Sequence, residues 1–150
     1  MQEVAISIRE MVASDAADAA ELCAQLGYPV TPHEIKERLR QFADFRDHVV
    51  FVACLDNRVV GWIDVGIVQH LQGSAYGEIG GLIVADEHRG CGIGQQLLRR
   101  AEEWTASFNV EKMLVRSRTE REGAHVFYNR NGFSHVKTSA VFTKPLSSGA

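Results

Sequence analysis

Residues 78–104 read EIGGLIVADEHRGCGIGQQLLRRAEEW, and the rest of the chain is organised around this stretch. Its first part, Glu78 to Val84, is short, apolar and β-branched at its end, which predicts a buried strand. From Gly92 onward, apolar residues recur every three or four positions, which predicts an amphipathic helix. The expected apolar face of this helix consists of Ile93, Leu97, Ala101, Trp104 and Phe108.

The loop between strand and helix, residues 89–94, reads RGCGIG. Glycine lacks a Cβ, so Gly90, Gly92 and Gly94 permit positive φ and let a ligand approach the main chain closely. The first amide groups of a helix have no partner within it, and the helix dipole adds positive potential there. The loop therefore predicts a phosphate or pyrophosphate site, with Arg89 adding a charge at its rim. The alternative is a glycine-rich turn that binds nothing.

Two common nucleotide-binding patterns do not fit this loop. The dinucleotide fingerprint needs Gly-x-Gly-x-x-Gly, and here the third glycine comes one residue early, at Gly94. A P-loop ends in Gly-Lys-Ser/Thr, whereas Gln95 and Gln96 follow Gly94 in this chain. The loop is therefore expected to bind a different phosphate-bearing ligand.

Composition places the chain among ordinary globular proteins, and its 150 residues predict a single domain over residues 1–150. The net charge of −3 gives no general attraction to nucleic acid or to an anionic membrane, so neither is expected as a partner. No apolar run is long enough to cross a bilayer, and the N-terminus lacks the pattern of a secretory signal. Cys23, Cys54 and Cys91 have no metal-type spacing, which predicts no metal site and reduced thiols in a cytoplasmic protein.

The remaining segments alternate between strand and helix patterns. The helix after Gly92 joins strands 78–84 and 112–116, which predicts a parallel pair with a right-handed crossover. The fold class is therefore α/β in the broad sense, of the α+β kind. The other expected elements are strand 4–9, a helix 14–26 capped by Ser14 with Asp15, a helix opened by the capping box at Thr31, hairpin strands 49–55 and 58–68, helix 122–131, and terminal strands 133–136 and 140–143.

A second motif, AHVFYNRNGF, occupies residues 124–133 and gives the pattern A-x-x-F-Y-x-x-x-G-F. Together with Arg89-x-x-Gly92-x-Gly94, this motif resembles the GCN5-related N-acetyltransferase (GNAT) superfamily over nearly the whole chain. The resemblance implies a mixed, mostly antiparallel sheet of six to seven strands with about four helices. It also implies that strands 78–84 and 112–117 run parallel and splay apart near their ends.

The resemblance implies acetyl-CoA as cosubstrate. Its pantetheine arm would enter the splay and pair with the exposed backbone of Leu82, Ile83 and Val84. Its pyrophosphate would rest on amide groups in the loop and the start of the helix. Arg121 stands where many relatives carry asparagine and is a weak candidate for a CoA-phosphate contact. The residues expected to hold the pyrophosphate are Arg89, Gly90, Cys91, Gly92, Ile93, Gly94 and Gln95.

The resemblance also implies direct transfer of the acetyl group to an amine. Glu78 matches a carboxylate base of the family, and the alternative is a strand-edge carboxylate that faces solvent. Tyr128 matches the phenol that protonates the departing thiolate, and the alternative is an aromatic ring that only lines the cofactor. A backbone N–H in the splay, from Ile83 or a neighbour, would stabilise the thioester oxygen.

Within the superfamily, the chain looks most like enzymes that acetylate small amines, such as aminoalkylphosphonate and aminoglycoside acetyltransferases. A protein or peptide N-acetyltransferase is the second hypothesis, and a non-catalytic acyl-CoA-binding regulatory module is the third. His125 belongs to the likeness with small-amine enzymes and either faces the site or serves as a structural histidine. Relatives of this size are commonly homodimers, so a homodimer is an open possibility for this chain.

Overall fold

The computed structural model of the protein describes residues 5–147. The chain divides into two compact units, Met1–Arg116 and Ser117–Ala150, and the described residues of each unit are treated separately. The first unit contains a five-stranded sheet in the order β1-β2-β3-β4-β5, in which only the β4–β5 pair is parallel. The strands are β1 (Ser7–Glu10), β2 (His48–Leu55), β3 (Arg58–Val68), β4 (Tyr76–Val84) and β5 (Met113–Val115).

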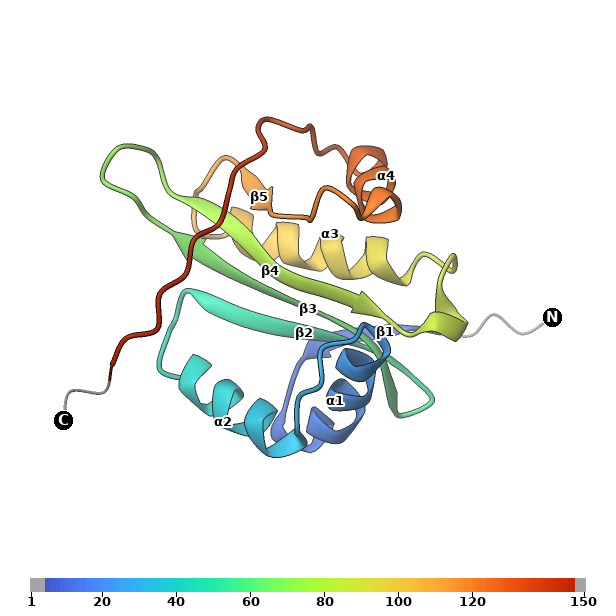
Figure 1. Ribbon diagram of the computed structural model, residues 1–150. Coiled ribbons are helices and arrows are strands. Elements are labelled where there is room, and N and C mark those ends of the chain that lie inside the picture. The colour runs from blue at the N-terminus through green and yellow to red at the C-terminus, as the bar shows by residue number, and fades with distance from the viewer. Residues whose placement is uncertain (1–4, 148–150) are drawn as a thin grey trace. The chain divides into compact units, whose positions relative to one another are not determined.

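Helices cover both faces of this sheet, with α3 (Ile93–Ala106) on one side and α1 (Ala16–Gln25) and α2 (Pro32–Phe42) on the other (Figure 1). A Cβ built on Gly61 of β3 would lie 3.2 Å from the side chain of Leu97 and 3.4 Å from that of Ile93, so α3 packs closely on the sheet at this glycine. No helix of residues 5–147 is long and apolar enough to cross a bilayer.

The apolar face of α3 differs slightly from the prediction. Ile93, Leu97 and Ala101 are buried as expected, and Leu98 and Thr105 complete the buried stripe. Trp104 is half-buried, and Phe108 is 37% exposed. The prediction for Phe108 was wrong because α3 ends at Ala106, so residue 108 no longer follows the helical spacing. The rings of Trp104 and Phe108 instead contact each other, with centroids 4.7 Å apart.

The two N-terminal helices begin in different ways. Thr31 Oγ1 accepts a hydrogen bond from the Glu34 amide, and Glu34 Oε1 accepts one from the Thr31 amide, which confirms the capping box of α2. Ser14 does not cap α1, because a 3₁₀ turn (Ala13–Asp15) precedes that helix. The Asp15 carboxylate is bonded to Arg9 instead, at 2.8 Å. The predicted first strand began at Val4, which lies outside the described residues.

The second unit contains α4 (Glu122–Arg130), as predicted, but the two terminal strands are not formed. The predicted count of six to seven strands is therefore wrong, since the described residues form five. Strands 133–136 and 140–143 would have made a two-stranded hairpin, which is only marginally stable in water by itself. Val136, Val141 and Phe142 are all more than 80% exposed, so no cross-strand packing supports such a hairpin.

Candidate functional site

The loop that precedes α3 adopts the backbone conformation for which its glycines were singled out. Gly90 has φ of +81° and Gly92 has φ of +82°, in the left-handed region that side chains disfavour. Gly92 is the N-cap residue of α3, and no side chain caps the helix there. Gly94 lies in the first helical turn and does not have a positive φ.

The backbone N–H groups of residues 90–95, here called the amide cradle, make no hydrogen bond within the described part of the chain. The first amide of this segment to find a partner is that of Gln96, which donates to Gly92 O at 3.1 Å. Free amides at a helix start form a site for an anion, because the groups point outward and the dipole reinforces them. The cradle therefore meets the main requirement of the predicted pyrophosphate site.

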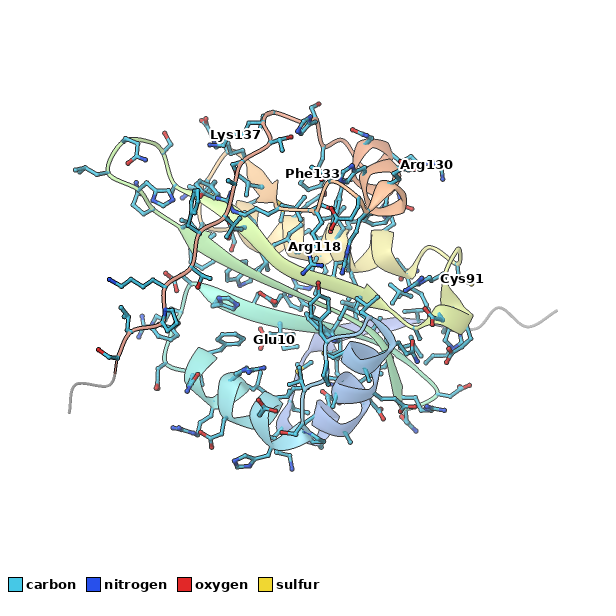
Figure 2. All side chains as sticks on the ribbon, viewed as in Figure 1. Glu10, Cys91, Arg118, Arg130, Phe133 and Lys137 are labelled. Carbon is cyan, nitrogen blue, oxygen red and sulfur yellow. The ribbon has the colours of Figure 1, made fainter. Side chains whose placement is uncertain are left out.

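Side chains contribute less to the amide cradle than its backbone does. Arg89 is more than half exposed, and its Nη2 lies 2.9 Å from Asp86 Oδ1, so its charge already has a partner at the rim. The Cys91 side chain is exposed at the surface beside the start of α3 (Figure 2). Its Sγ lies 3.9 Å from the carbonyl oxygen of Arg89. Cys91 therefore serves the cradle through its amide.

The parallel pair of strands separates close to the amide cradle. The β4–β5 ladder covers three residues of each strand, from Gly77 opposite Met113 to Ile79 opposite Val115. Strand β4 continues to Val84, so within the first unit residues 80–84 have no strand on the β5 side. This unpaired edge, here called the opening, lies where the family resemblance implied that the two strands splay apart.

A β-bulge decides which amides face this opening. The Gly77 amide donates to Lys112 O next to β5, whereas the Ala85 amide donates to Val60 O of β3. In a regular strand, the amides of Gly77 and Ala85 would point to the same neighbouring strand, since the two residues are an even number of positions apart. The register shift in β4, where Gly80 is the extra residue between the pairs Val65–Ile79 and Asp64–Gly81, reverses the alternation.

Beyond this bulge, the alternation places the Ile83 amide toward β3 and the amides of Leu82 and Val84 toward the opening. The predicted donor to the thioester oxygen was the amide of Ile83 or a neighbour, and of these the two neighbouring amides are the ones that face the opening. Leu82 and Val84 also direct their carbonyl groups to the open side, because both polar groups of a strand residue point the same way. An extended ligand can pair with these four groups as an added strand would.

Glu78 lies on the sheet face opposite α3. A Cβ on the preceding residue, Gly77, would strike Thr105 of α3, so the next side chain in β4 points to the other face. Glu78 Oε1 lies 3.3 Å from Nε of Arg116, and the Glu78 side chain is 30% exposed. The base candidate is therefore a partly buried, ion-paired carboxylate.

Two further polar residues on this face were missed by the sequence analysis. His48 Nε2 lies 3.2 Å from Asp64 Oδ1, and both side chains are less than a third exposed. The His48 ring stacks on Phe42 of α2 with a centroid distance of 4.0 Å. His48, Asp64, Glu78 and Arg116 are together called the charged cluster.

The signal for the charged cluster was a set of strand glycines. A Cβ on Gly66 would lie 2.8 Å from His48 Nδ1, and a Cβ on Gly80 would collide with the Asp64 carboxylate. Glycine weakens a strand interior, so its presence there indicates that another group approaches the backbone closely.

In the second unit, Tyr128 has the environment of a proton donor. Burial raises the pKa of Tyr128 above its ordinary value, and the nearby positive charge of Arg121 only partly offsets this effect. Its ring makes edge contacts with Phe127 and Phe133 at centroid distances of 5.3 and 5.5 Å. The phenol is therefore held in its protonated form at neutral pH.

His125 has a structural role in the same unit. Its Nε2 lies 2.9 Å from the carbonyl oxygen of Arg118, which can only accept, so this nitrogen carries the proton. Arg121 is the residue before the first turn of α4, and its carbonyl oxygen accepts from the His125 amide at 3.2 Å. His125 therefore links the segment before α4 to the start of that helix.

Comparisons with known proteins identify similarity to acetyltransferases. The model of the acetyltransferase (GNAT) family matches residues 15–133. An aminoglycoside N(6')-acetyltransferase type 1 of Stenotrophomonas maltophilia is 29% identical over 149 residues, which are 96% of each chain. An aminoalkylphosphonate N-acetyltransferase of Salmonella typhimurium is 37% identical over 98 residues, 63% of this chain and 61% of the relative. The solved structure of the aminoglycoside N-acetyltransferase AAC(6')-Iy in complex with CoA superimposes with a TM-score of 0.84 at 17% identity, over 97% of this chain and 98% of the other.

Proposed function

Because this chain belongs to the GNAT acetyltransferase family, we propose that it moves an acetyl group directly from acetyl-CoA to the primary amine of a small molecule. Family membership makes it an acyltransferase with acetyl-CoA as the acetyl donor. The observation that carries the proposal is the edge of β4 at residues 80–84, which pairs with no strand of the first unit and leads to the amides of residues 90–95, which have no hydrogen-bond partner among the described residues. We propose one catalytic domain over residues 1–150.

The donor would be held mainly by backbone groups. The amide cradle binds the pyrophosphate, and the open-side groups of Leu82 and Val84 pair with the pantetheine arm. Arg89 adds charge at the rim if it releases Asp86, and Arg121 is a further candidate for a CoA phosphate. One amide donor at a developing oxyanion is typically worth about 3–4 kcal/mol, and we assign this role to the amide of Leu82 or Val84.

The acceptor arrives as an ammonium, which has no lone pair, so a proton must leave before the nitrogen can react. Glu78 accepts this proton, directly or through water. The amine nitrogen then bonds to the thioester carbon as the carbon–sulfur bond breaks and its electron pair stays on sulfur, and the nitrogen releases its second proton to solvent to give the neutral amide. Tyr128 donates its proton to that sulfur and recovers one from solvent.

The raised pKa of Tyr128 supports its role as the acid, because a phenol must be protonated to donate. Activity should therefore persist as pH rises to the ordinary phenol pKa of 10.0 and fall only as pH passes through the higher value of the folded enzyme. We expect Tyr128→Phe to lower kcat about 10²-fold and to remove this alkaline decline. Phe127→Leu, which changes the neighbouring ring and no phenol, is the control. Unchanged turnover in Tyr128→Phe would eliminate Tyr128 as the acid.

The names of two relatives favour a small amine as the acceptor, one an aminoglycoside enzyme and the other an aminoalkylphosphonate enzyme. A cytoplasmic homodimer is part of the same proposal. Support for the dimer comes from exposed apolar side chains at Val136, Val141, Phe142 and Leu146, which a second chain would cover. Light scattering of the purified protein tests the dimer directly.

The proposal is tested first by binding and then by turnover. Acetyl-CoA should raise the melting temperature of the protein by mass action. Thiol release from acetyl-CoA should then depend on an amine, with aminoglycosides, aminoalkylphosphonates, polyamines and amino acids as the panel. The absence of a thermal shift at millimolar acetyl-CoA, together with no thiol release from any amine, would overturn the proposal.

A further inference from the structure

We infer that Asp64, held in place by His48, is the carboxylate that captures the ammonium group of the acceptor amine. The inference deepens the proposed function and rests on it. It assigns different roles to two carboxylates on one sheet face: Asp64 binds the ammonium group, and Glu78 receives its proton.

The first step of the argument is the position of Asp64 at the opening between β4 and β5. A Cβ on Gly80 would collide with its carboxylate, so the Asp64 oxygens lie directly over the backbone of that glycine. Gly80 follows Ile79, the last β4 residue paired with β5. The Asp64 carboxylate therefore lies where β4 loses its neighbour, beside the segment expected to hold the thioester.

The second step is that Asp64 and Glu78 lie on the same face. Glu78 is opposite Gly66 in the ladder, and Gly66 is two residues from Asp64 in β3. Side chains two residues apart in a strand share a face, so Asp64 and Glu78 are diagonal neighbours across the β3–β4 pair, at a typical separation of about 7–8 Å. An amine bound at one carboxylate is therefore within reach of the other, directly or through one water.

The third step concerns charge. Glu78 is paired with Arg116, whose guanidinium is always positive, so this pair has no net charge to attract an ammonium. The partner of Asp64 is an imidazole, which carries a charge only when both ring nitrogens are protonated. With a singly protonated imidazole, the Asp64–His48 pair has a net charge of −1. In that state Asp64 is the stronger attractor for a cationic acceptor.

The fourth step is that the chain holds Asp64 in one orientation. His48 donates from Nε2 to Oδ1 and is stacked on Phe42, so the imidazole cannot rotate freely. Gly66 and Gly80 clear the space that the imidazole and the carboxylate occupy. His48 is therefore a positioning residue, and Asp64 contacts the substrate itself.

The test compares Asp64→Asn with Asp47→Asn, which removes the same charge at an exposed position next to His48. Asp64→Asn should raise KM for the amine about 10–100-fold, the loss expected for a charge-assisted hydrogen bond, with a much smaller change in kcat. The KM for acetyl-CoA should not change. Asp47→Asn should have the same kcat, the same KM for the amine and the same KM for acetyl-CoA as the unmodified protein.

A binding measurement avoids dependence on turnover. With CoA bound, an amine from the panel should raise the melting temperature of the unmodified protein and of Asp47→Asn, but not that of Asp64→Asn. His48→Ala should weaken this amine effect and His48→Gln, which keeps a donor, should restore part of it; these two variants also serve if Asp64→Asn does not fold.

Equal amine-induced shifts in Asp64→Asn and Asp47→Asn would overturn the inference, and so would a loss of kcat with an unchanged amine KM. The inference also fails if no amine stabilises the CoA complex of the unmodified protein. These results leave the acetyl-CoA shift intact, whereas failure of the proposed function removes that shift. The two failures can therefore be told apart.

Discussion

The amide cradle consists of backbone groups, whereas the charged cluster consists of side chains. The cradle uses backbone N–H groups that follow one another over residues 90–95, and its glycines set the conformation locally. The cluster uses side chains from β2, β3, β4 and the residue after β5, which come together only through strand register. The cradle depends on the conformation of one short segment, whereas the cluster depends on the register of several strands.

This difference predicts which kinetic constant each substitution changes, and the largest effect is expected at Glu78. Glu78→Gln should lower kcat about 10²-fold near neutral pH, since it removes the general base, and should leave the Kd of acetyl-CoA unchanged. Glu102→Gln on the exposed side of α3 is the charge-matched control. Steady-state kinetics with a saturating amine measures the effect. A kcat equal to that of the control would exclude Glu78 as the base.

The next effect concerns the amide cradle alone. Gly92→Val places a β-branched residue at φ of +82° and a side chain over the amides. Strain of about 1–3 kcal/mol, which binding would have to overcome, should raise the Kd of acetyl-CoA about 10–100-fold. Gly73→Val is the control, because Gly73 has no positive φ and a Cβ there would meet nothing within 4 Å. Calorimetry that gives the same Kd for both variants would show that the cradle does not hold the donor.

A substitution at Gly80 should affect the acceptor side selectively. The new methyl group of Gly80→Ala would collide with the Asp64 carboxylate and displace it. We expect KM for the amine to rise about tenfold, the weakening of one charged hydrogen bond, while the Kd of acetyl-CoA stays within about twofold. Gly73→Ala is the control. If both constants change together, Gly80 belongs to the donor site as well, and the separation of the two regions fails.

The smallest effect is expected at an ion pair outside both regions. The hydrogen bond from Arg9 and the amide of Val12 lower the pKa of Asp15 below its ordinary value of 3.8. Asp15→Asn should reduce the free energy of unfolding by about 1 kcal/mol at pH 7. This loss is smaller than is usual for a charged hydrogen bond, because the Arg9 side chain is 45% exposed and solvent screens the ion pair. Urea unfolding measures the loss, with Asp44→Asn as the control, and kcat should not change.

The pH dependence of this contribution has a definite sign. A carboxylate with a depressed pKa in the folded state stabilises the protein fully above the unfolded value of 3.8. The stabilisation is lost as pH falls through the lower pKa of the folded state. The difference between Asp15→Asn and the unmodified protein should therefore shrink in acid, and a difference that grows as pH falls would contradict the assignment.

Local signals explain what could be predicted. The capping box at Thr31, the hairpin turn at Asp56 and Asn57, and the loop glycines Gly90 and Gly92 all depend on residues a few positions apart. The two turn residues have φ of 49° and 65°, a conformation that asparagine and aspartate tolerate better than most. Such features are decided by the conformational preferences of a short segment.

Long-range pairing explains what could not be predicted. The pairs His48–Asp64 and Arg116–Glu78 join residues 16 and 38 positions apart, and neither spacing suggests a contact. The bulge at Gly80 decides which of the predicted amides, that of Ile83 or of a neighbour, faces the opening, and it could not be located from the sequence of the two strands. Two apolar runs near the C-terminus had the pattern of strands but form none among residues 133–147.

The sequence by itself therefore determined the family, the central strands and helices, and the left-handed glycines of the loop before α3, because glycine placement and hydrophobic period act over a few residues. Tertiary structure decided which amides of β4 face the opening and which side chains surround it. The physical reason is that strand register and bulges set the direction of every side chain, and both depend on partners that lie far away along the chain.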